Sequence, residues 1–423
     1  MKRILSIALA LILILGLCAC GKETAKKPEK TPVPAFQVGF GRTNITPSNA
    51  NGLAMEGYSG QVSEGVFTYI LGTCVAVRDP EGGTLLLYTV DKTEMHKETI
   101  EALRERLTAE FDIPGDNITI SATHTHSSPK TTLLPDYINQ LVMAGEEALK
   151  DLSPATIQAG SYDVPNMNFV RHYIKNDGTY AGDNFGSVSG GLKDYAAEAD
   201  TTMRLIRFVR EDKKDVLMVN WQSHPKLAST ADTMEGQATR NLISADFVGF
   251  TRDYVEAQED VLFAYFNGAS GNMNPFSKLP DQQNVVSKNA KTYGEQLGGH
   301  VISALAGLKD MESGNVGSKK TALGDRGFDL HAYGVGGSLG FATVPAEIFC
   351  GTGQQIREGS PYEITFVLTC ANGRDTYIPT DNVWDYTVSN GDIPYEARIC
   401  RYPRGTAETL AQDLAGLLTE LHG

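Results

Sequence analysis

The sequence predicts a mixed α/β domain in which layered sheets are flanked by helices. Three observations support this: apolar runs of strand length alternate with helical periodicity, the composition is globular, and polar residues follow several of the apolar runs. Hydrophobic residues make up 41 % of the 423 residues and charged residues 21 %, which suits a protein with a large core. Since we find no internal repeat and no clear boundary, we expect a single large domain over residues 36–423.

The first elements of this domain alternate between strand and helix. Residues 84–90 are an apolar run of strand length, and residues 97–111 follow with apolar side chains every three or four positions. Residues 117–122 repeat the strand pattern, and residues 137–149 repeat the helical one.

The rest of the chain continues the pattern with a larger share of strands. Runs of apolar and β-branched residues mark the strands, and apolar side chains at helical spacing mark two further helices. The sequence predicts strands at 203–209, 215–221, 261–266, 339–344 and 363–370, and helices at about 289–305 and 410–421.

The N-terminus has the features of a processing signal. Two basic residues precede a short apolar stretch, residues 4–17, which is too short for a stable membrane span. The sequence Leu17-Cys18-Ala19-Cys20 then resembles the lipobox of bacterial lipoproteins. This predicts a signal peptide over residues 1–19, cleavage before Cys20 and a lipid on its sulfur. The alternative is an ordinary secretory signal in which Cys20 is incidental.

Residues 20–35 are expected to form a flexible tether. They are rich in Lys, Pro and Thr, and their lysines would rest near anionic lipid headgroups. We therefore expect a protein anchored to the membrane through Cys20, on the extracytoplasmic surface of a bacterial cell.

The charge distribution argues against nucleic acid as a partner. The formal net charge is −14, although the first 35 residues hold six basic residues and two acidic ones. The remainder is therefore more acidic than the total indicates. Phosphate binding needs a basic face, and an acidic body of this kind does not provide one.

The segment Thr123-His124-Thr125-His126-Ser127 is the most informative motif. It directly follows the apolar strand at 117–122, and alternate residues of a strand point to the same face. A strand ending here would hold both imidazoles side by side. Neutral imidazole is both a common metal ligand and a common acid/base group, so one ring would bind a metal while the other handles a proton. The alternative is two histidines without a shared task.

Polar residues follow the ends of six apolar runs. These ends carry Asp91, His124, His224, the loop 267–274, Glu347 and Asn372. Open α/β sheets collect their sites at the carboxyl ends of strands, so we expect one rim to gather all six.

Several stretches resemble the neutral/alkaline non-lysosomal ceramidase family, in the order in which that family carries them. The most specific are T-H-T-H-S at 123–127 and the sequence from Asn220 to Pro225, N-W-Q-S-H-P. The others are Gly39 to Arg42, Ile45 to Pro47, Gly57-Tyr58, Asn168 to Tyr173, the Gly-rich loop 268–275, Pro345 to Glu347, Asn372 to Thr380 and Tyr395-Glu396.

The resemblance implies a zinc enzyme. By motif, the family's ligand set falls on His124, His224, Glu347 and Tyr377, and such nitrogen and oxygen donors suit Zn²⁺. His126 would polarise the substrate or transfer a proton. Arg171 and Tyr395 match positions that line the family's active site.

One position departs from the family pattern. Where the family has a catalytic serine before a proline, this chain has Asn274 before Pro275. Asn274 is no nucleophile, but its amide can donate a hydrogen bond to an oxyanion or orient water. Ser270 is near in sequence but not at the matching position. The departure favours direct attack by zinc-activated water.

The resulting expectation is a zinc-dependent hydrolase that cleaves the amide of a lipid or small-molecule N-acyl substrate, with a sphingolipid as one candidate. One alternative keeps the enzyme and changes the substrate to an ester or another small N-acyl compound. The other is a binding lipoprotein that kept the fold and lost catalysis.

Overall fold

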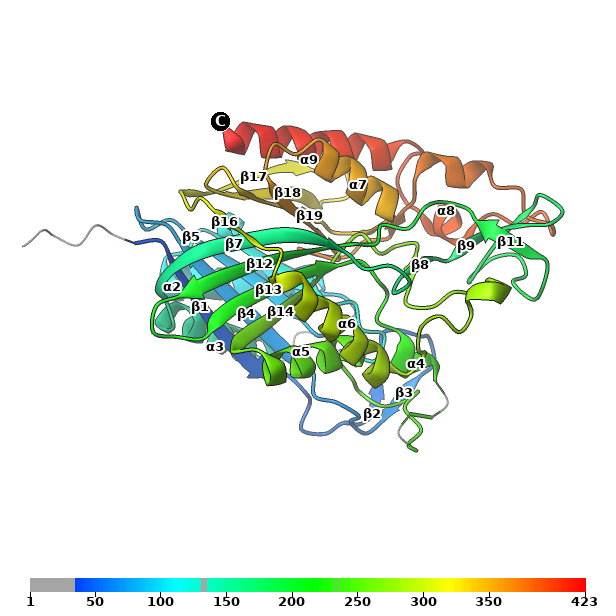
Figure 1. The fold of residues 1–423 in the computed structure, drawn as a ribbon, viewed down its shortest axis with the longest axis horizontal. Coiled ribbons are helices and arrows are strands. Elements are labelled where there is room, and N and C mark those ends of the chain that lie inside the picture. Colours follow the sequence, from blue (N-terminus) through cyan, green and yellow to red (C-terminus); the bar gives the residue numbers. More distant parts are fainter. Residues whose placement is uncertain (1–34, 131–134, 232, 235) are drawn as a thin grey trace, which may run out of the picture. The chain divides into compact units, whose positions relative to one another are not determined.

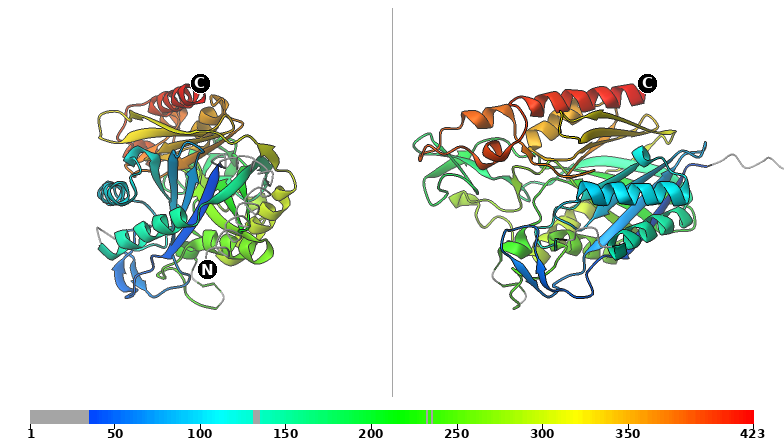
Figure 2. Two further views of the ribbon diagram at one scale, coloured as in Figure 1. Left: turned by 90° about the vertical axis from the view of Figure 1, so that its left-hand side faces the viewer. Right: turned by 180° about the vertical axis from the view of Figure 1, so that it is seen from behind.

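Two β-sheets packed face to face form the centre of the structure, and helices cover their outer faces (Figures 1 and 2). The structure is a computed structural model that describes residues 35–130, 135–231, 233–234 and 236–423. The expected signal peptide, Cys20 and nearly all of the tether therefore lie outside the described residues. Residues 35–423 form one compact unit.

The first sheet is mixed and has nine strands within the described residues. Neighbouring strands are antiparallel except for two parallel pairs, one at each end of the sheet. In sheet order the strands are β14 (Val261–Asn267), β13 (Asp215–Trp221), β12 (Thr202–Arg210), β7 (Ser153–Asp163), β1 (Gln37–Asn44), β4 (Leu71–Arg78), β5 (Thr84–Val90) and β6 (Ile118–Ala122), and β16 (Lys309–Met311) pairs with β7.

The second sheet is smaller, and short two- and three-stranded pieces extend the fold. The second sheet consists of β17 (Val316–Ala322), β18 (Asp329–Val335), β19 (Leu339–Val344) and β21 (Ile364–Thr369). The short pieces are β2 (Asn51–Ala54) with β3 (Val62–Glu64), β8 (Phe169–Val170) with β15 (Met273–Asn274), β9 (His172–Lys175) with β10 (Tyr180–Gly182) and β11 (Leu192–Tyr195), and β20 (Glu347–Ile348) with β22 (Tyr377–Ile378).

The helices complete a layered arrangement of helix, sheet, sheet and helix. One group covers the first sheet and a second group covers the second sheet (Figure 2). The first group is α2 (Lys97–Phe111), α3 (Pro135–Lys150), α5 (Asp246–Gln258) and α6 (Ala290–Leu305), and the second is α7 (Cys350–Glu358) and α9 (Thr406–His422); the short helices α4 (Leu227–Thr230) and α8 (Tyr395–Ile399) lie near one end of the sheets.

The central strands are apolar on both faces because both faces are covered. In β4, Cys74 and Ala76 belong to the core under α2 and α3, whereas Val75 and Val77 belong to the core between the sheets. This arrangement explains why the sequence shows continuous apolar runs rather than alternation.

The first sheet curls, so that its two ends approach each other. Thr89 in β5 donates a hydrogen bond to the carbonyl of Tyr265 in β14, although these strands lie near opposite ends of the sheet order. Arg42 in β1 also donates to the carbonyl of Phe263 in β14, at 2.5 Å. The curl brings the loop after β6 toward the loop after β13.

The predicted fold class and most predicted elements are confirmed. The expected strands at 84–90, 215–221 and 339–344 and the expected helix at 97–111 match β5, β13, β19 and α2 residue for residue. The other expected strands agree with the structure to within one residue at each end. The expected closing helix begins four residues earlier, at Thr406. The sequence analysis did not identify β1, β4, β7, β17, β18, α5 or α7.

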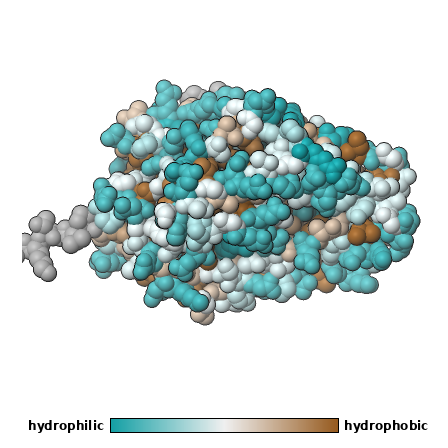
Figure 3. All heavy atoms as spheres, turned by 90° about the horizontal axis from the view of Figure 1, so that it is seen from above, coloured by the Kyte–Doolittle hydropathy of each residue, from teal (hydrophilic) through white to brown (hydrophobic). Residues whose placement is uncertain are grey.

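No helix among the described residues combines the length and the apolar character needed to cross a membrane. The face shown in Figure 3 is mostly hydrophilic, and its hydrophobic residues are scattered rather than gathered.

Candidate metal centre and active site

The two histidines of the T-H-T-H-S segment lie in a turn. β6 ends at Ala122, and His124 adopts a left-handed backbone conformation with φ of 69°. The expectation that a strand holds both rings on one face is therefore wrong. Backbone hydrogen bonds from His124 to Lys92 and from His126 to Pro225, both 2.9 Å, fix the turn, and the two ring centroids lie 5.0 Å apart.

The four residues expected to bind zinc converge on one point. Nε2 of His124 and Nε2 of His224 each lie 3.2 Å from Oε2 of Glu347. The hydroxyl of Tyr377 lies 3.4 Å from Nε2 of His224. All four side chains are buried. They come from the ends of β6 and β13 and from the parallel pair β20 and β22, in which Glu347 stands opposite Tyr377.

This donor set fits zinc. A tetrahedral Zn²⁺ holds nitrogen and oxygen ligands at about 2.0–2.1 Å, which separates two ligand atoms by about 3.3 Å. The 3.2 Å separations agree with that value. Within the described residues, Nε2 of His124 and Oε2 of Glu347 are buried and make no hydrogen bond. Because buried polar atoms are nearly always paired, convergent unpaired atoms indicate a ligand site.

Backbone carbonyls orient both imidazoles. Nδ1 of His124 lies 2.7 Å from the carbonyl of Thr93, and Nδ1 of His224 lies 3.0 Å from the carbonyl of Met273. Each Nδ1 therefore carries the proton as a donor, which leaves Nε2 with a free lone pair. This is the outer-shell support that metal-binding histidines commonly have.

Arg374 orients the carboxylate of Glu347. Nη2 of Arg374 lies 2.9 Å from Oε1 of Glu347, and Nη1 lies 2.9 Å from Oε2 of Glu94. One oxygen of Glu347 is thus occupied by a guanidinium, and the other is turned toward the two histidines. Burial acts to raise the pKa of Glu347, but His124, His224 and Arg374 hold it well below its usual range, so the group is a carboxylate.

His126 lines the same cavity, and its imidazole lies against two other rings. Its ring centroid lies 5.4 Å from that of His224 and 5.2 Å from that of Tyr58. Neither ring nitrogen has a hydrogen-bond partner within the described residues. Burial, followed by the neighbouring His124 and His224, keeps the pKa of His126 well below its ordinary value. A neutral imidazole with free nitrogens is suited to accept a proton.

Arg171 and Tyr395, both expected at the active site, border the same cavity as three of the four converging residues, His124, Glu347 and Tyr377. The guanidinium of Arg171 lies 5.3 Å from the centre of the Tyr377 ring and 2.6 Å from Oε1 of Glu396. Oε2 of Glu396 also lies 3.1 Å from Nε2 of His172. Glu396 therefore holds Arg171 against the site.

Asn274 lies behind the cavity rather than in its lining. Its amide donates a 2.6 Å hydrogen bond to Oδ2 of Asp183, and its own oxygen has no partner within the described residues. The predicted catalytic role of Asn274 stays a prediction. Ser270 is buried and accepts a 3.0 Å hydrogen bond from the side chain of Asn267.

Two of the six strand-end groups do not join the site, so the expectation of one rim is wrong for them. Asp91 is buried beside Arg252 at 2.9 Å. Asn372 accepts a 3.0 Å hydrogen bond from the backbone of Ile120 and links β6 to the second sheet through Thr343 at 3.2 Å. Both residues satisfy buried polar groups and hold the sheets together.

The cavity has a volume of about 270 Å³ and is mainly polar. The sequence analysis missed several of its residues, although Arg374 and Lys226 stand inside or beside the motifs that it singled out. The charged residues of the lining are Glu56, Glu94, Arg171, Lys226, Glu347 and Arg374, and the remaining lining side chains include Tyr58, Thr93, Asn184, Tyr377 and Tyr395.

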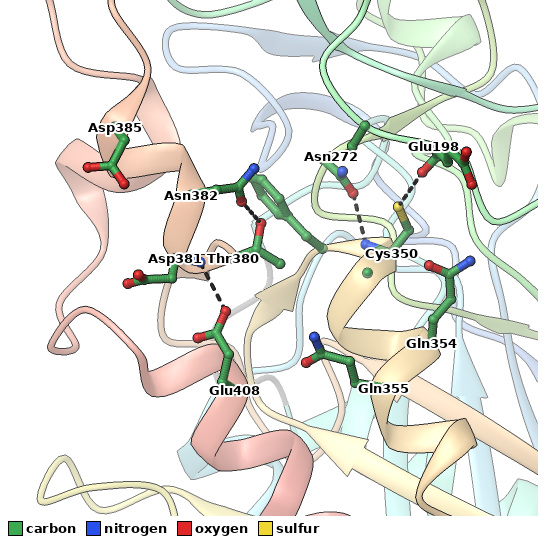
Figure 4. Close-up of a pocket in the computed structure, with 13 residues that line it drawn as sticks. Glu198, Asn272, Cys350, Gln354, Gln355, Thr380, Asp381, Asn382, Asp385 and Glu408 are labelled. Carbon is green, nitrogen blue, oxygen red and sulfur yellow. Dashed lines mark hydrogen bonds between the residues drawn. The ribbon is translucent and has the colours of Figure 1, made fainter.

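A second cavity lies at the N-terminus of α7 (Figure 4). Asn272 accepts a 2.9 Å hydrogen bond from the backbone of Cys350 there, and the backbone of Asp381 donates to Glu408 at 3.1 Å. None of the residues expected in the active site lines this cavity.

Comparisons with known proteins place this site in a family context. The model described as "Neutral/alkaline non-lysosomal ceramidase, N-terminal" matches residues 36–278. That range contains His124, His126, Arg171, His224 and Asn274. It ends before Glu347, Tyr377 and Tyr395.

Two curated relatives are neutral ceramidases from flies. The protein of Drosophila pseudoobscura pseudoobscura is 25 % identical over 275 residues, which covers 59 % of this chain and 34 % of that protein. The protein of Drosophila melanogaster is 24 % identical over 248 residues, which covers 53 % and 32 %. The matched part of the chain spans about a third of the length of these relatives.

Two solved structures share the fold over nearly the whole chain. Neutral ceramidase from Pseudomonas aeruginosa is 16 % identical, with a TM-score of 0.72 and coverage of 92 % of this chain and 74 % of that one. A ceramidase described as complexed with C2 is 14 % identical, with a TM-score of 0.71 and coverage of 92 % and 75 %.

Proposed function

The chain belongs to the neutral/alkaline non-lysosomal ceramidase family, and on this basis we propose that it is a zinc-dependent hydrolase that cleaves the amide bond of an N-acyl substrate. The observation that carries the proposal is the convergence of two imidazole nitrogens on one carboxylate oxygen at 3.2 Å, with the tyrosine hydroxyl beside them. A metal ligand set accounts for this arrangement.

His124, His224, Glu347 and Tyr377 would hold the ion. When bound, zinc supplies a Lewis acid that polarises a carbonyl and lowers the pKa of water. The carbonyls behind the two histidines and the guanidinium behind Glu347 keep the ligand atoms aimed at one point without rearrangement. Such pre-organisation is what a catalytic centre requires.

The other side chains supply proton transfer and charge stabilisation. His126 borders the same cavity and is free at both ring nitrogens among the described residues, so it would accept the proton of the attacking water and deliver it to the leaving amine. Arg171, held by Glu396, would stabilise negative charge that develops on the carbonyl oxygen. The hydroxyl of Tyr395 borders the same cavity and would orient the substrate.

The small polar cavity favours a small N-acyl compound over a long-chain lipid. Ester hydrolysis would use the same groups, because an ester carbonyl develops the same oxyanion. The competing proposal is a lipoprotein that retains the metal centre and binds a ligand but catalyses no reaction.

Metal analysis and turnover test the proposal together. We expect one zinc per chain, and we expect His124→Ala and His224→Ala each to lose both zinc and activity on a panel of N-acyl amides and esters. His300→Ala, in α6, is the control and should keep both. Full zinc occupancy in both site variants would refute the ligand assignment. Zinc in the wild type without turnover on any substrate would favour the binding protein.

We also propose that Cys20 carries a lipid that tethers the domain of residues 36–423 to the extracytoplasmic face of a bacterial membrane. The supporting observation is the sequence from Leu17 to Cys20 after a short apolar stretch, followed by a Lys- and Pro-rich segment. The domain itself begins at the first described strand, β1.

A further inference from the structure

A buried lysine lies in the wall of the active-site cavity. Lys226 follows the metal-site segment His224-Pro225, and its side chain is only 8 % exposed. Its Nζ lies 2.8 Å from Oδ2 of Asp183 and 5.4 Å from the centre of the Phe276 ring. A charged ammonium is costly to bury, so its position beside the reacting groups calls for an explanation.

Lys226, Lys278 and Asp183 form a cluster that carries two positive charges and one negative charge. Asp183 is the single carboxylate of the cluster, and it also lies 2.8 Å from Nζ of Lys278. The neutral amide of Asn274 donates to the same carboxylate at 2.6 Å. Two ammonium groups therefore share one carboxylate. Asn274 fixes Asp183, which in turn fixes Lys226 at the cavity.

The other cationic groups of the lining are already matched by acids. Arg171 pairs with Glu396 at 2.6 Å. Arg374 is shared between Glu94 and Glu347, both at 2.9 Å. Lys226 is thus the cation of the described lining whose carboxylate partner, Asp183, is divided with a second ammonium group, that of Lys278.

Lys226 shares the cavity with the groups proposed for catalysis. Its side chain lines the same cavity as His126 and Arg171. The neighbouring lining residue Asn184 adds an amide that can donate a hydrogen bond. A cation and an amide in a polar cavity of about 270 Å³ suit a small anionic oxygen group rather than an acyl chain.

We propose that Lys226 is a specificity-determining residue that binds a carboxylate on the substrate, so that the preferred substrate is a small N-acyl compound with a carboxylate near the scissile amide, such as an N-acyl amino acid. This inference rests on the proposed hydrolase function and names the substrate class of the same site. Asn274 and Asp183 are positioning residues that act through Lys226.

A matched pair of substrates tests the proposal. N-acylglycine and N-acylethanolamine can carry the same short acyl chain. N-acylglycine then has a carboxylate where N-acylethanolamine has a hydroxymethyl group. In the zinc-loaded wild type, we expect kcat/KM for N-acylglycine to exceed that for N-acylethanolamine by about 10–100-fold, the value of one charge-assisted contact. Lys226→Met should abolish this preference by lowering kcat/KM for N-acylglycine far more than kcat/KM for N-acylethanolamine.

Two further variants separate charge from structure. Lys226→Arg keeps the charge and should keep most of the preference. Lys288→Met is the control, because Lys288 also lies over the Phe276 ring, at 5.6 Å, but does not line the cavity. It should behave as the wild type.

Equilibrium binding of N-acetylglycine and N-acetylethanolamine to the zinc-loaded proteins gives a readout that does not need turnover. Equal preference in the wild type and in Lys226→Met, in kinetics or in binding, would overturn the role of Lys226. Absence of hydrolysis of every amide, with the binding preference retained and Lys226-dependent, would instead refute the hydrolase function and leave the carboxylate site in place.

Discussion

Gly57 provides a direct test of how the segment around residue 57 supports the T-H-T-H-S turn and the site. This segment runs beside the turn, since the backbone of Glu56 donates to the carbonyl of Ser128 at 3.0 Å. A Cβ added at Gly57 would lie 2.1 Å from the carbonyl oxygen of His126 and 2.6 Å from its Cα. Gly57→Ala therefore cannot be accommodated unless the backbone of His126 or of residue 57 moves.

The size of that movement sets the expected effect. Ordinary contacts of a Cβ begin at about 3.4 Å, so the backbone has to shift by about 1 Å. A misplacement of about 1 Å in a catalytic group costs about a hundredfold in rate. Forcing an extra methyl group into a packed site also costs about 1–3 kcal/mol of stability.

We therefore expect Gly57→Ala to lower kcat about a hundredfold while zinc stays bound, because His124 and His224 are held by other contacts. Steady-state kinetics, metal analysis and urea unfolding measure the three quantities. Gly299→Ala is the matched control. A Cβ there meets no atom within 4 Å, and alanine in place of glycine in a helix is expected to stabilise by about 1 kcal/mol.

Wild-type activity and stability in Gly57→Ala would refute this reasoning. It would mean that the segment around Gly57 yields without moving His126. Loss of zinc together with loss of activity would contradict the narrower statement that the change acts on His126 alone.

Three further predictions concern residues in and beyond the site. Asn274→Ala removes the amide that holds Asp183 and should lower kcat/KM for N-acylglycine by about 10-fold in steady-state kinetics, less than Lys226→Met does, whereas Asn274→Ser keeps a donor and should retain activity. Burial acts to raise the pKa of Glu396, but its neighbours His172 and Arg171 lower it from 4.5 to about 2, so this carboxylate stabilises the fold above pH 4.5 and the contribution is lost as the pH falls toward 2. In urea unfolding, Glu396→Gln should reduce the stability difference between pH 5 and pH 2 by an amount on the order of 3 kcal/mol, and an unchanged difference would contradict the pairing. Cys20→Ser should release the protein from the membrane fraction, and a lipid-free N-terminal peptide in the wild type would show plain secretion instead.

The fold could be predicted where burial shapes the sequence directly. β5 and β13 are covered on both faces, so each stands out as an unbroken apolar run. β17 was not predicted because it is an edge strand with exposed lysines and no apolar run. β7 was not predicted because its apolar residues are few and Gly160 interrupts the strand pattern.

The four converging residues could be chosen as candidate ligands because each stands beside a strand end inside a recognisable motif. The residues that support them could not. Arg374 joins Glu347 to Glu94, and Lys226 is held by Asp183, 43 positions earlier in the chain. Such partnerships depend on the curl of the first sheet and on the docking of the second, which local sequence patterns do not record.

The left-handed backbone at His124 implies a trade between stability and function. A non-glycine residue in this conformation is strained by about 1–2 kcal/mol, and Cys370 and Asn372, which join β6 to the second sheet, are also left-handed. Glycine would relieve the strain at position 124, but it would remove the imidazole. In metal-free protein, His124→Gly should therefore be less destabilised in urea unfolding than His124→Ala, the reverse of the usual order for these two residues. The chain keeps a backbone conformation that opposes its own folding, and the gain is an imidazole already aimed at Glu347 and His224.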